Sequence, residues 1–435
     1  MARVQPEPPI MAPPVVSQRA VAALFVARQH LARPRTRRLT ARSLLAFVED
    51  VGGLQLDSIN VVERGHHLTL GSRFGPYERA TFERIAYRRR LLFEYWAHAA
   101  CLVPASHFPA WRRVMLDYSL RSRAWGKWLT KNRAVLRAVE EAIATKGPMG
   151  STDFEHRRAP NSAGGWWNWK PAAHALDYLW MSGRTLVHSR RHFQKRFDLA
   201  ERMMPEALAR EPLTLEGFRR WHLRQSLRAM GAASESDLRM YLTYPRTAAS
   251  ERRHALRAAL DSGEIVEVEV KGARRPWLAL AEDLPALAAA HLQRRAAAGT
   301  TLLSPFDSFL WHRDRTRQLF GYDYTLEVYT PGSKRVHGYY SLPIFHDGQL
   351  IGRLDPKTHR TLKRLEVKAV HFEPWFAKGA APPAASWGSV DQGAALAGVG
   401  LALRSLAAFV GAEEIAVGRV TPGALGPALK RAVKP

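Results

Sequence analysis

The sequence predicts an α+β protein in which three tandem winged-helix (helix-turn-helix) modules are followed by a small β-barrel domain. Three observations support this fold class. A unit of helix, turn, helix and two apolar strands joined by a basic stretch occurs three times. Beyond Thr300, short strand-like runs alternate with turns that contain Gly, Pro and Asp. The 435 residues include 65 Lys and Arg against 39 Asp and Glu, a net charge of +26 that favours a polyanionic partner, nucleic acid first.

The length of the chain exceeds what one hydrophobic core usually serves, so we expect several domains. The first residues are rich in proline, which disfavours both a helix and the apolar core of a signal peptide. The predicted segments are a disordered leader at 1–16, winged-helix modules at 17–105, 106–208 and 209–298, and a β-barrel with a C-terminal helical segment at 299–435.

The first module is predicted to contain three helices. One begins near Ser17, and a second runs from an N-cap at Thr40 to a C-terminal stop at Gly52. After a short extended piece, the stretch "SINVVERGHHLTL" from Ser58 is expected to form the third helix. The module ends in the two strands of "YRRRLLFEYWAHAACLVPA".

The third module shows the repeated unit most clearly. Ser234 and Asp237 form a capping box at the start of one helix. Val266, Val268 and Val270 alternate with glutamates, which is typical of a half-buried strand, and a basic hairpin tip follows. A winged helix places a helix in the major groove and its hairpin along phosphates. Helices followed by a hairpin also occur in other compact α+β modules; three instances on a chain this basic favour nucleic-acid binding.

The C-terminal part is expected to be rich in short strands. The runs "YTLEVYT", "YYSLPIF", "QLIGRLD" and "RLEVKAVHFE" are separated by "PGSK", "HDG" and "DPKTH", which suggests an antiparallel barrel or a strongly curved sheet. The segment "AKGAAPPAAS" is expected to be a linker or exposed loop, and "QGAALAGVGLALRSLAAFVG" a helix that covers the sheet.

Several classes of site and location have no support in the sequence. The single cysteine, Cys101, excludes an intramolecular disulfide and a cysteine-based metal site, and it suits the cytoplasm. No glycine-rich nucleotide loop and no serine-hydrolase elbow occurs, so no cofactor is expected. The most apolar run, from Ala394, is stopped by Arg404, so we expect no membrane insertion. The protein is expected to be a monomer.

Two further patterns are ambiguous. The pair His66-His67 suggests a metal, but neighbours on a helix point about 100° apart and no partner lies at ligand spacing, so we expect none. Packing of one ring inward with the other near a phosphate or a turn fits better. The tryptophans of "GGWWNWKPAAHALDYLW" either stack on unpaired bases or belong to the core, and their helical spacing favours the core for most of them.

The polar pair Gln55 and Asp57 flanks Leu56 directly after two glycines. In an extended segment the two polar side chains face the same way while the leucine is buried. Such a pair can hold one water molecule, with the carboxylate as proton acceptor and the amide as a positioning group. The structural alternative, in which Asp57 or Ser58 caps the next helix, is favoured by the pattern alone.

The segment "LQLDSINVVERGHHLTLGSRFGPY" closely resembles a stretch of the YcaQ/AlkZ family of bacterial crosslink-repair DNA glycosylases. "LLSPFDSFLWHRDRTRQLFGYDYTLEVY" and "GYYSLPIF" resemble the C-terminal part of that family, and the resemblance extends from about Ser17 to the 370s. The family motif is Gln, an apolar residue, then Gln or Asp, so this chain is similar to the branch with a carboxylate. The chain departs from the family in its proline-rich leader and in Gly65, where alanine is expected.

The resemblance implies three winged-helix modules around a DNA-binding cleft and monofunctional excision of alkylated purines. Its substrate would be double-stranded DNA that carries alkylated purines or interstrand crosslinks joined through guanine N7. Gln55 and Asp57 would then be catalytic. The candidate DNA-contacting side chains are the basic residues of the same segment and of the second and third hairpins, namely Arg64, His66, His67, Arg73, Arg190, Arg191, Lys195, Lys271, Arg274 and Arg275.

Two chemical expectations follow. An N7-alkylated purine is already positively charged and departs neutral, so one carboxylate suffices where ordinary glycosidases need two. No lysine need act as a nucleophile, so the product is expected to be an abasic site. The competing hypothesis is a non-enzymatic winged-helix regulator, which explains the charge but gives no reason for the Gln55/Asp57 pair.

Overall fold

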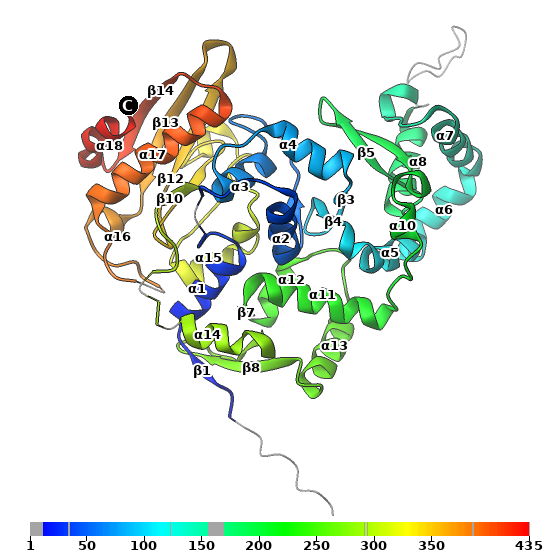
Figure 1. The fold of residues 1–435 in the computed structure, drawn as a ribbon, viewed down its shortest axis with the longest axis horizontal. Helices are drawn as coiled ribbons and strands as arrows, with labels where there is room; N and C mark the ends of the chain where they lie inside the picture. The colour runs from blue at the N-terminus through cyan, green and yellow to red at the C-terminus, as the bar shows by residue number, and fades with distance from the viewer. Residues whose placement is uncertain are drawn as a thin grey trace, which may run out of the picture.

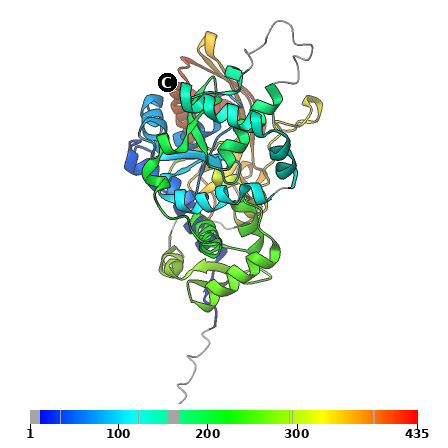
Figure 2. The ribbon, with the colours of Figure 1, turned by 90° about the vertical axis from the view of Figure 1, so that its right-hand side faces the viewer.

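The structure is a computed structural model that describes residues 12–33, 35–121, 123–154, 169–290, 292–293, 295–384 and 387–434. Figure 1 shows a broad, heart-shaped molecule in which the first unit lies at the centre, the second to its right, the third below, and the C-terminal sheet to the left. In Figure 2 the second unit faces the viewer.

The first unit is built around a three-stranded sheet in the order β2-β4-β3. Thr40 caps its first helix and Gly52 ends it in a left-handed conformation, as predicted. The last strand, β4, lies between the other two. The elements are α2 (Ala41–Val51), β2 (Leu54–Gln55), α3 (Gly65–Phe74), α4 (Arg79–Glu83), the π-helical turn η1 (Arg84–Arg88), β3 (Leu92–Trp96) and β4 (Ala100–Pro104).

The second unit likewise ends its helical part in a two-stranded hairpin, β5 and β6, but it has additional helices before and after. Its last strand, β6, pairs with β5 on one side and with Met149 on the other. Tyr178 and Trp180 of α8 are buried in the core, whereas Trp166 and Trp167 lie outside the described residues. The elements are α5 (Phe108–Leu116), α6 (Arg123–Lys131), α7 (Arg133–Lys146), η4 (Ser151–Phe154), α8 (Trp169–Met181), β5 (Thr185–Arg191), β6 (Gln194–Leu199), α9 (Ala200–Met203) and α10 (Pro205–Leu208).

The third unit repeats the arrangement, with β9 between β7 and β8. The predicted capping box is present, since Ser234 and Asp237 exchange side-chain and backbone hydrogen bonds. The predicted alternating strand corresponds to β8. The elements are α11 (Leu215–Met230), β7 (Ala232–Ala233), α12 (Glu235–Tyr241), α13 (Ala249–Asp261), β8 (Ile265–Val270), β9 (Trp277–Leu280) and α14 (Leu284–Ala290).

The N-terminal residues belong to the third unit, which corrects two predicted boundaries. Val15 and Val16 form strand β1, which pairs in parallel with Glu269 and Val270 of β8, so the predicted leader is ordered at its end. Helix α1 (Gln18–Arg28), capped by Ser17, packs against α14 and α11, not against the first unit. Seven consecutive residues of α1, from Ala20 to Val26, are apolar and buried, which explains why the helix inserts between elements of the third unit.

The C-terminal part is an open five-stranded sheet in the order β10-β11-β12-β13-β14. The predicted closed barrel is therefore wrong, because β10 and β14 are the two edges of the sheet. The long helix α17 covers it, as Figure 1 shows. The elements are β10 (Thr300–Leu302), α15 (Arg313–Phe320), β11 (Leu342–His346), β12 (Gln349–His359), β13 (Arg364–Phe372), α16 (Pro374–Ala377), α17 (Gln392–Val410), β14 (Glu414–Thr421) and α18 (Gly426–Val433).

One predicted strand and one predicted turn differ from the structure. The run "YTLEVYT" is a loop, because the Glu327 carboxylate accepts backbone N–H groups of Val336, His337 and Gly338 and so closes the loop on itself. The predicted turn "DPKTH" is part of β12, since Pro356 follows a β-bulge at which the missing N–H is tolerated.

Within the described part of the chain, α17 alone is long and apolar enough to cross a membrane by length and composition. Half of its apolar window is buried inside the protein, where it contacts α18 and β10. The helix therefore has a packing role in this fold.

Candidate active site

The polar pair lies at the end of β2, in the middle of the first unit. Gln55 pairs with Cys101 of β4, and the Leu56 N–H donates to the Ala100 carbonyl over 2.8 Å. Leu56 is buried, whereas Gln55 and Asp57 are half-buried. The alternation expected of an extended segment is present, so the two polar side chains project on one side.

A distant tryptophan fixes the orientation of Gln55. The Trp311 indole Nε1 donates to Gln55 Oε1 over 2.8 Å. An indole N–H can only donate, so it must face the amide oxygen, and the Gln55 NH₂ group is left without an acceptor among the described residues. The Trp311 ring is itself held by the imidazole of His98, which stacks on it at 4.4 Å and 5°. Gln55 therefore offers a donor to whatever occupies the site.

Asp57 closes a local turn and does not cap a helix. Its Oδ1 accepts the N–H of Ile59 over 2.8 Å. Helix α3 begins only at Gly65, with Arg64 at the N-cap, so the predicted helix from Ser58 and the helix-cap role of Asp57 are both wrong. No hydrogen-bond donor among the described residues reaches the second oxygen, Oδ2. One carboxylate oxygen is thus fixed while the other is left for a ligand.

The segment after Asp57 is held extended by the C-terminal sheet, which is why it is not helical. The Thr358 N–H donates to the Val61 carbonyl over 3.0 Å. Arg360, at the end of β12, donates to the Asn60 side chain over 2.7 Å and to the Val62 carbonyl over 3.1 Å. These contacts join residues 300 positions apart, so local sequence gives no signal for them.

The other acidic side chain near the motif, Glu63, is committed to a structural ion pair. Its Oε2 accepts from Arg79 and its Oε1 accepts the Arg64 N–H over 2.9 Å. Burial alone would raise the pKa of Glu63, but these hydrogen bonds and the Arg79 charge outweigh it and lower the pKa. Glu63 is therefore an ionised partner of arginine and cannot serve as a proton donor at neutral pH.

The two adjacent histidines are both inside the protein, which corrects their predicted contact with DNA. His66 is 4% exposed and His67 is 6% exposed. His67 Nδ1 is hydrogen-bonded to the Tyr77 hydroxyl at 2.7 Å. Burial lowers the pKa of His67 to about 4 and that of His66 well below its usual range. Both rings are neutral and belong to the buried side of α3.

The predicted DNA-contacting arginines and lysines differ in whether their side chains are buried or exposed. Arg73 is fully buried and its guanidinium pairs with Asp307, so it cannot reach a phosphate. Arg190 is largely buried against Glu94, and the Lys195 ammonium lies 3.4 Å from the Trp180 ring centroid. Arg64 is half-buried. The exposed members of the predicted set, available to DNA, are Arg191 of the second hairpin and Lys271, Arg274 and Arg275 of the third.

Gly65, where the family resemblance led us to expect alanine, lies against Phe306. A Cβ added at this glycine would come within 2.9 Å of Phe306 Cδ2. The Phe306 carbonyl also accepts from Trp311 Nε1 at 3.2 Å. The glycine lets the first unit approach the Trp311 loop closely.

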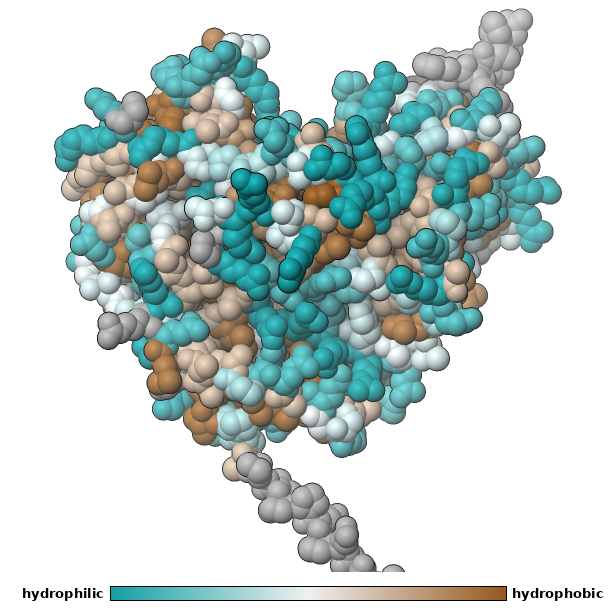
Figure 3. All heavy atoms as spheres, in the orientation of Figure 1, coloured by the Kyte–Doolittle hydropathy of each residue, from teal (hydrophilic) through white to brown (hydrophobic). Residues whose placement is uncertain are grey.

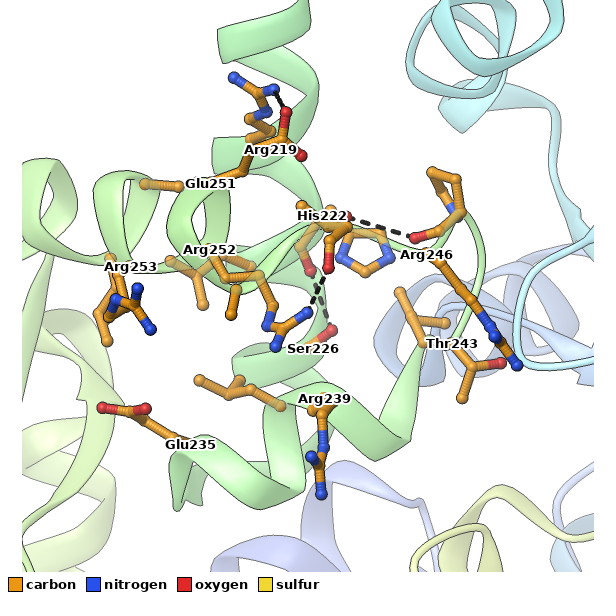
Figure 4. Close-up of a pocket in the computed structure, with 18 of the residues that line it drawn as sticks. Arg219, His222, Ser226, Glu235, Arg239, Thr243, Arg246, Glu251, Arg252 and Arg253 are labelled. Atoms are coloured by element: carbon orange, nitrogen blue, oxygen red, sulfur yellow. Dashed lines mark hydrogen bonds and ion pairs between the residues drawn. The ribbon is translucent and has the colours of Figure 1, made fainter. Parts of the chain in front are cut away.

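A cavity of about 670 Å³ lies in the third unit between α11, α12 and α13. Figure 4 shows its lining, in which Arg219 forms an ion pair with Glu251. Arg239, Arg246 and Arg253 also line it, and their guanidinium groups have no partner among the described residues. Neither residue of the Gln-x-Asp pair lines this cavity, so it is separate from the candidate active site.

On the face shown in Figure 3, the upper edge is hollowed between two lobes. In the same orientation Figure 1 places the C-terminal sheet on one side of this notch and the β5–β6 hairpin on the other, with α3 and α4 between them. Hydrophilic side chains gather around the notch. No group of three His, Cys, Asp or Glu side chains placed to hold a metal ion occurs among the described residues.

Comparison with known proteins identifies the family. Residues 48–409 match the family described as DNA glycosylase AlkZ-like, a span that begins within α2 and includes the Gln-x-Asp pair and the second and third repeated units from α5 to α14. Among solved structures, the chain resembles the Streptomyces sahachiroi DNA glycosylase AlkZ with a TM-score of 0.60 and 18% sequence identity, over 93% of this chain and 99% of that one. The competing hypothesis of a non-enzymatic regulator is therefore set aside. The chain belongs to the AlkZ-like family, and it is a DNA glycosylase.

Proposed function

We propose that this DNA glycosylase hydrolyses the N-glycosidic bond of N7-alkylated purines in duplex DNA, including purines joined in interstrand crosslinks, with Asp57 and Gln55 as the catalytic pair. The observation that carries the proposal is which polar atoms of the two side chains are already hydrogen-bonded within the protein. Asp57 has one oxygen fixed by Ile59 and one that no donor of the described residues reaches, and Trp311 aims the Gln55 amide N–H groups away from itself.

The pair suits a reaction with a positively charged transition state. As the bond to N7-alkylguanine breaks, the sugar becomes oxocarbenium-like and the base departs as a neutral molecule. The Asp57 carboxylate stabilises the sugar cation and accepts a proton from the attacking water. The Gln55 NH₂ donates to the same water or to the sugar-phosphate. Glu63 is ionised and paired with Arg79, so it cannot protonate the leaving base, and no protonation is needed because that base departs as a neutral molecule.

DNA binding is proposed to use the three repeated units as winged-helix modules. The exposed basic tip of the third hairpin and Arg191 of the second contact phosphates. The free arginines of the cavity between α11, α12 and α13 add positive charge to the same unit. We further propose that the enzyme acts as a monomer in the cytoplasm.

The test uses purified protein and a duplex with a single N7-methylguanine, followed by hot alkali. We expect strand breaks at the lesion and, with a duplex joined through two guanine N7 atoms, separation of the strands on a denaturing gel. The undamaged duplex and the lesion duplex without enzyme serve as controls, because N7-methylguanine is itself labile to hot alkali. Borohydride should trap no enzyme–DNA adduct, because no lysine forms a Schiff base. Absence of alkali-labile sites in the lesion duplex would contradict the proposed substrate.

A further inference from the structure

The tip of the second hairpin has a backbone conformation that its residues do not favour. β5 and β6 pair as far as Arg191 and Gln194, which leaves His192 and Phe193 as a two-residue turn. Their φ angles are +49° and +67°. A two-residue turn of this kind is usually built from Asn-Gly or Gly-Gly, because residues with a Cβ rarely adopt positive φ. Such a departure at a defined position points to a function for the side chain.

The Phe193 ring lies between two arginines from different parts of the chain. The Arg64 guanidinium carbon is 3.8 Å from the ring centroid and that of Arg190 is 4.3 Å. The His66 ring stacks on the same phenylalanine at 6.2 Å and 14°. Cation–π contacts of this length favour a planar guanidinium laid over an aromatic face. Figure 1 shows the β5–β6 hairpin reaching from the second unit towards α4 of the first.

Arg190 makes the position of the ring rigid. Its Nε and Nη2 donate to the two oxygens of Glu94 over 2.7 and 2.5 Å, and its Nη1 donates to the Phe193 carbonyl over 2.7 Å. Glu94 is 1% exposed and belongs to β3 of the first unit. The hairpin tip is thus anchored to the first unit through a buried ion pair.

Arg64 connects the ring to the candidate active site. Its Nη1 donates to the Ser58 carbonyl over 2.9 Å, and Ser58 directly follows Asp57. The guanidinium therefore lies between Phe193 on one side and the segment that begins at Asp57 on the other. Arg360 and Thr358 hold the same segment from the C-terminal sheet.

We propose that Phe193 is a positioning residue for excision: its ring fixes Arg64, and Arg64 holds the Ser58 carbonyl so that the Asp57 carboxylate faces the sugar. This inference rests on the proposed role of Asp57. It makes the second unit a part of the active site and not only a DNA-binding module. It also explains why a phenylalanine occupies a turn position that glycine would fill with less strain.

The test uses the fact that the backbone of the turn favours Asn-Gly, whereas the proposed role requires the Phe193 ring. The double variant H192N/F193G gives the turn its preferred residues and removes the ring. We expect it to remain folded at the assay temperature and to bind lesion DNA with a Kd within about threefold of wild type, while single-turnover excision falls at least about tenfold. H192N alone eases the turn and keeps the ring, so its excision rate should match the wild type. F193Y should recover most of the excision rate that F193G loses.

A second pair of variants covers the case in which the glycine variants fold poorly. R64K keeps the charge but loses the flat guanidinium, so it should lower the excision rate as F193L does, and the combined variant should be no slower than either alone. Wild-type excision by a folded F193G, or a rate loss fully explained by weaker DNA binding, would overturn the inference. If D57N is inactive while F193G is active, only this inference fails; if D57N is active, the proposed catalytic pair itself fails.

Discussion

At the scale of single residues, the site depends on Trp311, whose indole N–H holds the Gln55 oxygen. We predict that W311F slows single-turnover excision by about tenfold, the equivalent of removing one hydrogen bond of about 1 to 1.5 kcal/mol, because the Gln55 amide can then rotate. The melting temperature should change little, since phenylalanine keeps most of the buried ring. W375F in α16, far along the chain from the motif, is the matched control. An unchanged rate in W311F would mean that the Gln55 orientation does not matter.

Part of this site follows from sequence and part does not. The spacing of Gln55 and Asp57 about a buried leucine predicts that they share one side of a strand, because the period of an extended chain is two. The contacts that complete the site come from Trp311, Arg360 and Phe193, between about 130 and 300 positions away. No local pattern encodes such pairings. Charge alone likewise could not separate buried Arg73 from exposed arginines, since the difference is the buried partner Asp307.

At the scale of elements, capping signals and strand alternation predict most helices and hairpins, because they act over a few residues. The helix expected from Ser58 fails because tertiary hydrogen bonds from Thr358 and Arg360 hold that segment extended. The barrel fails for a related reason. Its predicted turn at Pro356 is a bulge within one long strand, and β14 joins the sheet in parallel after α17. The propensities of neighbouring residues do not predict that two strands separated by a long helix pair with each other.

The third hairpin carries a prediction about DNA binding. Lys271, Arg274 and Arg275 are exposed at its tip. Replacing all three with alanine should weaken binding at low salt and make the log Kd against log salt plot shallower, by about 0.9 for each phosphate that is no longer neutralised. The control is R317A, because Arg317 is already paired with Asp314 and Asp323. An identical salt slope in the triple variant would exclude this hairpin from the DNA interface.

At the scale of the whole molecule, buried neutral histidines make stability depend on pH. Burial lowers the pKa values of His67, His107 and His222 to about 4, against about 6.5 in the unfolded chain. The unfolded state therefore binds more protons than the folded state between pH 6.5 and pH 4. As a result, the free energy of unfolding is highest above pH 6.5 and decreases as the pH falls towards 4. Each such histidine should remove about 2 kcal/mol at pH 5.

The measurement for this prediction is the melting temperature of the wild type and of H67Q at pH 7 and pH 5. Glutamine can still bond to the Tyr77 hydroxyl but does not titrate, so H67Q should lose fewer degrees on acidification than the wild type. An equal loss in both proteins would show that His67 is not held neutral.

Several parts of the chain position the Asp57 carboxylate. Hairpins from the second unit and from the C-terminal sheet hold the segment that follows Asp57, and the first unit presents Asp57 beside Gln55 at the end of β2. The most direct test is D57N, assayed for single-turnover excision of N7-methylguanine and for affinity to the same duplex. We predict a Kd within about threefold of wild type and a rate lower by about a thousandfold or more, because the variant has no charge to stabilise the sugar cation. Excision by D57N at the wild-type rate would contradict the assignment of Asp57 as the catalytic residue.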